Sequence, residues 1–172
     1  MTTERGVLVA GVGNVFLGDD GFGVAVARRL AQCTLPAGVV VADYGIRGMH
    51  LAYELLDGRF DTLIMVDAVP VDEPPGTVVV LEVDPRGDDS GADLPATPDA
   101  HGMDPAAVLR MLRMLGGTAP GVLDQVLVVG CRPAVVDERM ELSEPVRAAV
   151  GEAARLVLDL AAHRRSNGRD GR

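Results

Sequence analysis

The chain has 172 residues, of which 48% are hydrophobic but only 3% are aromatic, and its formal net charge is −9. This negative charge argues against extended contact with nucleic-acid phosphate or with an anionic membrane surface, because both require clustered Lys and Arg. A core made of Val, Leu, Ala and Met suits a buried parallel sheet that is covered by helices. Small molecules, cations or proteins are therefore the expected partners.

Short β-branched runs alternate along the chain with amphipathic segments of helical length, which is typical of a parallel α/β sheet. The patterns predict five strands, at residues 7–12, 39–42, 62–66, 77–83 and 125–129. They predict helices at residues 23–32 and 48–56, a third from Asp104 to the Gly116-Gly117 stop, and a fourth at residues 143–162. Because the proline-rich link over 69–76 is too short for a crossover helix, the fourth strand is expected to be an antiparallel edge strand.

We predict a single α/β domain over residues 1–162, with a twisted, mainly parallel five-stranded sheet between helices, and a disordered tail over 163–172. The two cysteines, Cys33 and Cys131, have no zinc-site or CxxC spacing, which favours a reduced compartment. No segment approaches the ~18 consecutive apolar residues of a membrane helix, and MTTERGVLV lacks the profile of a signal peptide. A cytoplasmic protein is therefore expected.

A glycine-rich stretch, VAGVGNVFLGDDGFG, follows the first strand over residues 9–23. A dinucleotide-binding fingerprint starting at Gly11 would need glycine where Phe16 stands, and a bound phosphate would meet the like charges of Asp19 and Asp20. A cation is therefore the better ligand for this loop. The alternative is that one aspartate caps the following helix while the other is solvated, which is the commoner role of aspartates at such positions.

Carboxylates also stand at the ends of the next two predicted strands, at Asp43 and at Asp67. Because the carboxyl ends of parallel strands converge on the crevice where ligands bind, these acids are candidates for one site. Asp67 follows a strongly apolar run, so its burial requires a partner, a proton or a metal; the alternative is a carboxylate that accepts N–H bonds from its own turn. His101, at the exit of a long polar loop, could complete a mixed oxygen and nitrogen ligand set for a divalent metal.

Nucleophilic catalysis finds little support. No serine lies in a Gly-x-Ser-x-Gly elbow. Cys131 stands beside Arg132, which could favour its thiolate, but a small buried residue at a strand end is the commoner reading of such a cysteine.

Taken together, these segments resemble the [NiFe]-hydrogenase maturation proteases, which are nickel-dependent endopeptidases that trim the C-terminus of the hydrogenase large subunit. The resemblance is carried by GVGNVFLGDDGFG, DYGIRGMHLAYELL, DTLIMVDAVP, DAHGMDPAAVL and VLVVGCRP, in the order of the family and over nearly the whole chain. It implies the same five-stranded fold. It also implies a substrate, the large-subunit precursor, that is cut once after its nickel has been inserted.

The resemblance further implies that Asp20, Asp67 and His101 bind nickel carried by the substrate, while Asp43 lies in a loop that shapes the cleft and assists cleavage. These four residues are the predicted catalytic set, and another divalent metal could occupy the site in the isolated protein. Asp19 is then expected to be the solvated neighbour or the helix cap. Two other functions stay open: a nickel-checking chaperone that docks on the precursor without cutting it, and a nucleotide-binding α/β domain.

Overall fold

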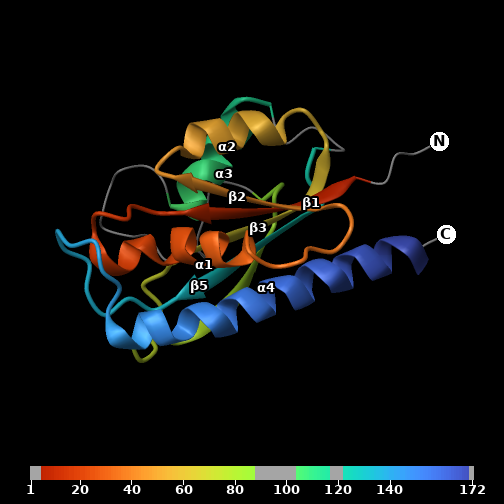
Figure 1. Ribbon diagram of the computed structural model, residues 1–172. Helices are drawn as coiled ribbons and strands as arrows, with labels where there is room; N and C mark the ends of the chain where they lie inside the picture. Colours follow the sequence, from red (N-terminus) through yellow and green to blue (C-terminus); the bar gives the residue numbers. More distant parts are fainter. Residues whose placement is uncertain (1–4, 88–103, 117–121, 171–172) are drawn as a thin grey trace.

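A mixed five-stranded sheet forms the centre of the fold, in the strand order β2-β1-β3-β5-β4 (Figure 1). The structure is a computed structural model that describes residues 5–87, 104–116 and 122–170. The first four strands in this order run parallel, and β4 pairs antiparallel with β5 at one edge. This confirms the α/β fold and the antiparallel edge strand. The strands are β1 (Gly6–Val12), β2 (Val39–Gly45), β3 (Phe60–Ala68), β4 (Val78–Val83) and β5 (Gln125–Cys131).

Within the described part of the chain, two helices cover each face of the sheet (Figure 1). Helices α1 (Phe22–Leu30) and α4 (Glu144–Asp170) pack on one face, and α2 (Gly48–Leu55) and α3 (Pro105–Met114) pack on the other. A short 3₁₀ helix, η1 (Gly18–Gly21), precedes α1. All four predicted helices are present, and Asp104 caps α3 as expected, with its carboxylate accepting the Ala107 N–H at 2.7 Å.

The sheet divides the core into two layers, and strand β1, which lies inside the sheet, contributes side chains to both. Its side chains alternate, so that Val7 and Val9 pack with α1 and α4 while Leu8 and Val12 pack with α2 and α3. This alternation follows from the period of a strand, in which successive side chains point to opposite faces. Because both faces are buried, the strand reads as one continuous apolar run.

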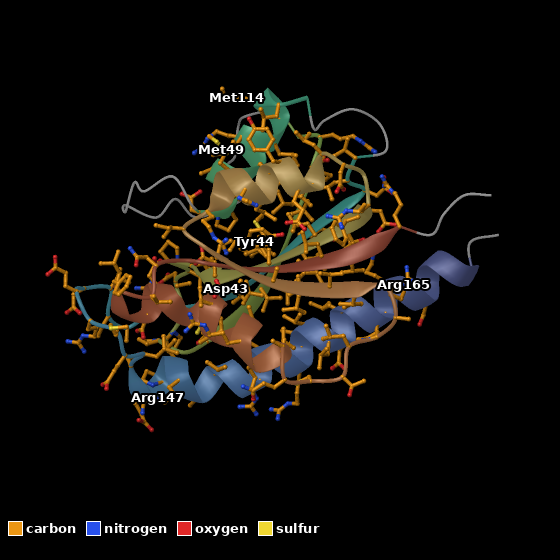
Figure 2. All side chains as sticks on the ribbon, turned by 45° about the horizontal axis from the view of Figure 1, so that its top comes forward. Asp43, Tyr44, Met49, Met114, Arg147 and Arg165 are labelled. Carbon is orange, nitrogen blue, oxygen red and sulfur yellow. The ribbon has the colours of Figure 1, made fainter. Side chains whose placement is uncertain are left out.

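Helix α4 is longer than the sequence predicts. We expected it to end near Ala162 and to be followed by a disordered tail, but it continues to Asp170. The guanidinium of Arg165 donates hydrogen bonds to the carbonyl oxygens of Ala37 and Arg5, at 2.9 and 3.0 Å (Figure 2). These bonds tie the end of the helix to the start of the sheet, a contact that local periodicity does not reveal. Within the residues that the structure describes, no helix has the length and apolar character that crossing a membrane requires.

The glycines of the opening stretch allow α1 to approach the sheet closely. A Cβ atom at Gly11 would lie 2.4 Å from the Gly23 carbonyl oxygen, and one at Gly23 would lie 2.0 Å from the Val66 carbonyl oxygen. Neither contact is sterically allowed, so both positions require glycine. The glycine pattern that resembles a nucleotide loop thus serves the packing of the helix against β1 and β3.

Candidate active site

Asp43 and Asp67 flank the end of β1 as the parallel topology predicts. Gly11 of β1 pairs with Asp43 on one side and with Val66, the residue before Asp67, on the other. The chain then leaves β1 through Gly13, whose N–H donates to the Gly45 carbonyl oxygen at 2.9 Å. The carboxyl ends of the three strands therefore meet around Gly13.

Gly13 brings Asp20 and Asp67 together. It has a positive φ of 128°, and a Cβ atom there would lie 2.0 Å from the Asp20 carbonyl oxygen and 3.3 Å from the Asp67 Oδ1 atom. The Asp20 carboxylate is itself bound beside Gly13, because its Oδ2 atom accepts the Asn14 N–H at 2.8 Å. Two of the predicted ligands thus lie around one residue that has no side chain.

Asp67 is a buried carboxyl group, with only 3% of the residue exposed. Burial raises its pKa well above the usual value, and the negative charges of Asp20 and Asp104 raise it further. Its Oδ1 atom accepts the Ala68 N–H at 2.8 Å, which opposes this increase in pKa without cancelling it. Asp67 therefore does accept the hydrogen bond from its own turn that we considered as an alternative. This bond is not enough to make the ionised carboxylate favourable at this position.

Asp104 is a neighbour of the site that sequence reasoning missed. We recognised it only as the cap of α3, yet its charge also acts on Asp67. Its short distance from His101 along the chain was the available signal, because a helix that starts just after a candidate ligand begins near the same site.

Asp43 lines a cleft whose lining residues do not include Asp20 or Asp67. This cleft of about 280 Å³ is formed by residues 13–16 and 43–47 together with Val24 and Arg28. The Arg28 Nε atom lies 3.5 Å from the Asp43 Oδ2 atom, and the Asp43 side chain is 35% exposed. Figure 2 shows Asp43 above α1, next to the buried Tyr44. Gly13 lines the same cleft and also lies beside Asp20 and Asp67, so it connects Asp43 with the acid pair.

His101 lies outside the described residues, so its position relative to Asp20 and Asp67 stays a prediction. Among residues 5–87, 104–116 and 122–170, no group of three or more His, Cys, Asp and Glu side chains has the geometry of a metal site. The predicted ligand set therefore depends on His101 for its third member. Of the two described histidines, His50 is exposed at the start of α2 and His163 is exposed on α4.

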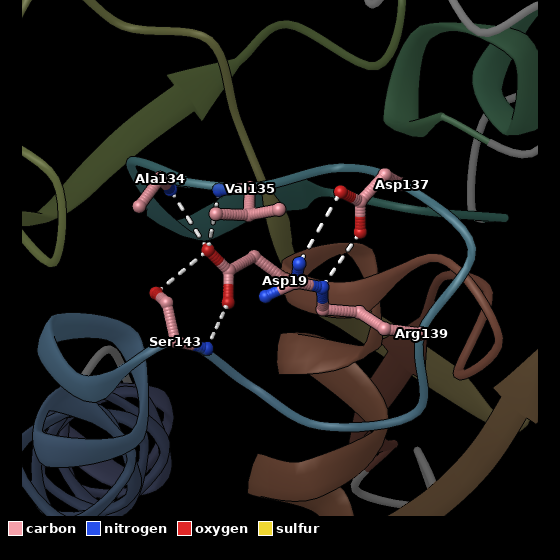
Figure 3. A network of polar contacts seen from close by, with 6 residues as sticks. All are labelled: Asp19, Ala134, Val135, Asp137, Arg139 and Ser143. Atoms are coloured by element: carbon pink, nitrogen blue, oxygen red, sulfur yellow. Dashed lines mark hydrogen bonds and ion pairs between the residues drawn. The ribbon is translucent and has the colours of Figure 1, made fainter.

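Asp19 is not the solvated residue that we expected. It is completely buried, and its carboxylate accepts the N–H groups of Ala134, Val135 and Ser143 at 2.8, 2.9 and 2.7 Å (Figure 3). The Ser143 hydroxyl donates a fourth hydrogen bond at 2.8 Å. Asp19 does not cap α1 either, because its partners belong to the segment between β5 and α4, more than a hundred residues further along the chain. Sequence periodicity has no means of detecting such a contact.

The Asp19 contacts predict that stability depends on pH. Burial acts to raise the Asp19 pKa, but the hydrogen bonds from Ser143, Val135 and Ala134 outweigh it and lower the pKa below its ordinary value of 3.8. The contribution of Asp19 to stability is therefore complete above pH 3.8 and is lost as the pH falls below this value. We expect the free energy of urea unfolding to fall more steeply below pH 3.8 in the parent protein than in Asp19→Asn. Equal slopes would contradict this assignment.

Cys131 is a structural residue rather than an activated thiol. Burial raises the pKa of its thiol to about 12, and the charges of Asp19 and Glu152 add to the increase. The neighbouring Arg132 therefore does not produce a thiolate. This confirms the reading of Cys131 as a small buried residue at the end of a strand.

The comparisons with known proteins agree with the fold and with the motifs. The family model described as hydrogenase maturation protease matches residues 24–160. A protein of Methanocaldococcus jannaschii that carries the same family name is 33% identical over 162 residues, covering 90% of this chain and 96% of its own. The hydrogenase 2 maturation protease of Escherichia coli is 32% identical over 154 residues, or 88% of each chain.

A solved structure extends this agreement to three dimensions. The hydrogenase maturating endopeptidase HybD from E. coli superposes with a TM-score of 0.73, at 31% identity and with 94% of each chain covered. The family model begins at residue 24, after the glycine-rich stretch, so the match does not depend on the motif with which our interpretation of the site began. Sequence, fold and motif order lead to one conclusion, that this chain belongs to the hydrogenase maturation protease family.

Proposed function

We propose that this chain is a cytoplasmic endopeptidase that removes the C-terminal extension of a [NiFe]-hydrogenase large-subunit precursor after nickel has been inserted. The observation that carries the proposal is the meeting of Asp20 and Asp67 around Gly13, at the carboxyl edge of the sheet, in a chain of this family. Family membership supports the reaction class and the substrate. The acid pair supports a site where a cation in the substrate is bound.

The donor set suits a nickel ion that arrives with the precursor. Carboxylate oxygens and an imidazole nitrogen are suitable ligands for such an ion. In this chain a buried Asp67 lies near the like charges of Asp20 and Asp104, so a bound cation would offset the repulsion that raises the Asp67 pKa. Asp20, Asp67 and His101 would thus bind the precursor best when its nickel is present.

Asp43 is our candidate for the general base. Its carboxylate borders the cleft, where it could accept a proton from water as the water oxygen attacks the carbonyl carbon of the scissile peptide bond. The same proton would then pass to the leaving nitrogen as the carbon–nitrogen bond breaks. Arg28, whose Nε atom lies 3.5 Å from the Asp43 Oδ2 atom, is the cationic neighbour of this carboxylate.

Alanine substitutions at Asp20, Asp67 and His101 test this proposal. We expect each variant to fold and to lower kcat/KM for trimming of a nickel-loaded precursor at least about 100-fold, the effect of losing a few kcal/mol of interaction at the reacting centre. Asp72→Ala is the matched control, because Asp72 is an exposed aspartate outside the site. Normal trimming by all three variants would contradict the proposal. Tight binding without any cutting by the parent protein would identify the non-cleaving chaperone instead.

A further inference from the structure

We infer that Asp19 is a positioning residue, which holds the turn that carries Asp20 in place for the recognition of nickel-loaded precursor. The effect on precursor recognition rests on the proposed function, whereas the effect on the position of Asp20 is argued from contacts within the chain. Asp19 itself is completely buried, so it acts through Asp20 and not by touching the substrate.

The turn that carries Asp20 has little stability of its own. η1 contains only four residues, and Leu17 at its start supplies no side-chain cap. Short 3₁₀ helices have poor hydrogen-bond geometry and depend on their surroundings. The position of this turn therefore has to be fixed by contacts with other parts of the chain.

Those contacts come from the segment between β5 and α4, residues 132–143. On the backbone, Gly18 N–H donates to the Arg139 carbonyl oxygen at 2.7 Å, and Asp19 N–H donates to the Val135 carbonyl oxygen at 2.9 Å. On the side chain, the Asp19 carboxylate accepts four hydrogen bonds from the same segment (Figure 3). The residue next to Asp20 is thus bound from both its backbone and its side chain.

A carboxylate is the group that this arrangement needs, because all four partners are donors. Its Oδ2 atom accepts from Ala134, Val135 and the Ser143 hydroxyl, while Oδ1 accepts from the Ser143 N–H. An asparagine would have to point its NH₂ group at one of these donors, since an amide offers a single acceptor oxygen. Asp19→Asn therefore leaves a buried N–H unsatisfied with almost no change in side-chain shape, whereas Ser143→Ala removes one bond only.

The Asn14 N–H reports the position of Asp20, because it donates to the Asp20 Oδ2 atom at 2.8 Å. If Asp19 holds the turn, loosening Asp19 lengthens this bond. We expect Asp19→Asn to shift the Asn14 amide resonance and to accelerate its hydrogen exchange at least about tenfold, with a smaller change in Ser143→Ala. The control is Arg165→Ala, which loosens the opposite end of the sheet and should leave the Asn14 resonance unchanged.

Binding of the precursor is the second readout, measured with nickel-loaded and nickel-free forms. We expect Asp19→Asn to weaken binding of the nickel-loaded form at least about tenfold, or ~1.4 kcal/mol, and to leave the nickel-free form unaffected. An unchanged Asn14 amide in the variants that fold would overturn the inference, and so would a displaced amide with unchanged preference for nickel-loaded precursor. If Asp19→Asn does not fold, the Asn14 amide is measured in Ser143→Ala instead. No preference for nickel in the parent protein would instead overturn the proposed function, while the amide would still show whether Asp19 positions Asp20.

Discussion

Replacing Asp67 with asparagine is expected to abolish precursor trimming while it raises the stability of the fold at neutral pH. The asparagine retains the acceptor for the Ala68 N–H and removes the charge. Because the pKa of Asp67 is raised by burial and by Asp20 and Asp104, the folded state binds a proton there more tightly than the unfolded state does. The energetic cost of Asp67 is thus absent below pH 3.8, which is the ordinary pKa of this carboxyl group, and it grows as the pH rises above this value.

Urea unfolding of Asp67→Asn and of the parent protein at pH 7 and at pH 4 checks this prediction. We expect the variant to gain about 1–3 kcal/mol at pH 7, the usual scale for a buried polar group that lacks a sufficient partner, and less at pH 4. Asp72→Asn, which removes an exposed charge, should change neither stability nor trimming. A variant that is less stable than the parent at pH 7 would contradict the predicted energetic cost of Asp67. One that still trims would contradict its role in the site.

Gly13→Ala is expected to disrupt the site and to cost about 3 kcal/mol or more of stability, because it combines backbone strain with overpacking. Its φ of 128° is unfavourable for alanine, and the added Cβ atom would lie 2.0 Å from the Asp20 carbonyl oxygen. Since the obstructing atom belongs to the backbone, η1 has to move, and the Asp20 carboxylate moves with it. Trimming should therefore fall at least about 100-fold even at temperatures where the variant is folded.

Gly58→Ala is the matched control for this substitution. Gly58 also has a positive φ, of 75°, but a Cβ atom there would meet nothing within 4 Å. We expect it to cost only the backbone term, about 1–2 kcal/mol, with normal trimming of the precursor. If thermal unfolding showed equal losses for the two alanine variants, the steric conflict at Gly13 would be ruled out.

The strands and helices could be predicted because each has a local cause. Both faces of the sheet are buried, so strands such as β3 read as apolar runs, and the Asp-Pro start of α3 contains its own cap. The convergence of Asp43 and Asp67 on the end of β1 could also be predicted, since it follows from parallel strands alone.

The remaining features depend on contacts between distant parts of the chain. Asp19 and Asp20 are adjacent and chemically identical, yet one is buried by residues 134–143 and the other lies beside Gly13. Likewise, α4 extends past Ala162 because Arg165 reaches Ala37. No periodicity or capping rule within a short window contains this information. The glycines of the opening stretch are a further example, because their spacing suggests a nucleotide loop. Their surroundings show instead that Gly11 and Gly23 allow α1 to pack closely on the sheet, and that Gly13 lies beside Asp20 and Asp67.

The most direct test of the account is the intact mass of a [NiFe]-hydrogenase large-subunit precursor after incubation with this protein. Two samples of the precursor are compared, one loaded with nickel and one free of it. We predict that the loaded precursor loses a single C-terminal peptide, whereas the nickel-free precursor keeps its full mass. A loaded precursor of unchanged mass, or equal cutting of both samples, would contradict the claim that this chain is a nickel-recognising maturation endopeptidase.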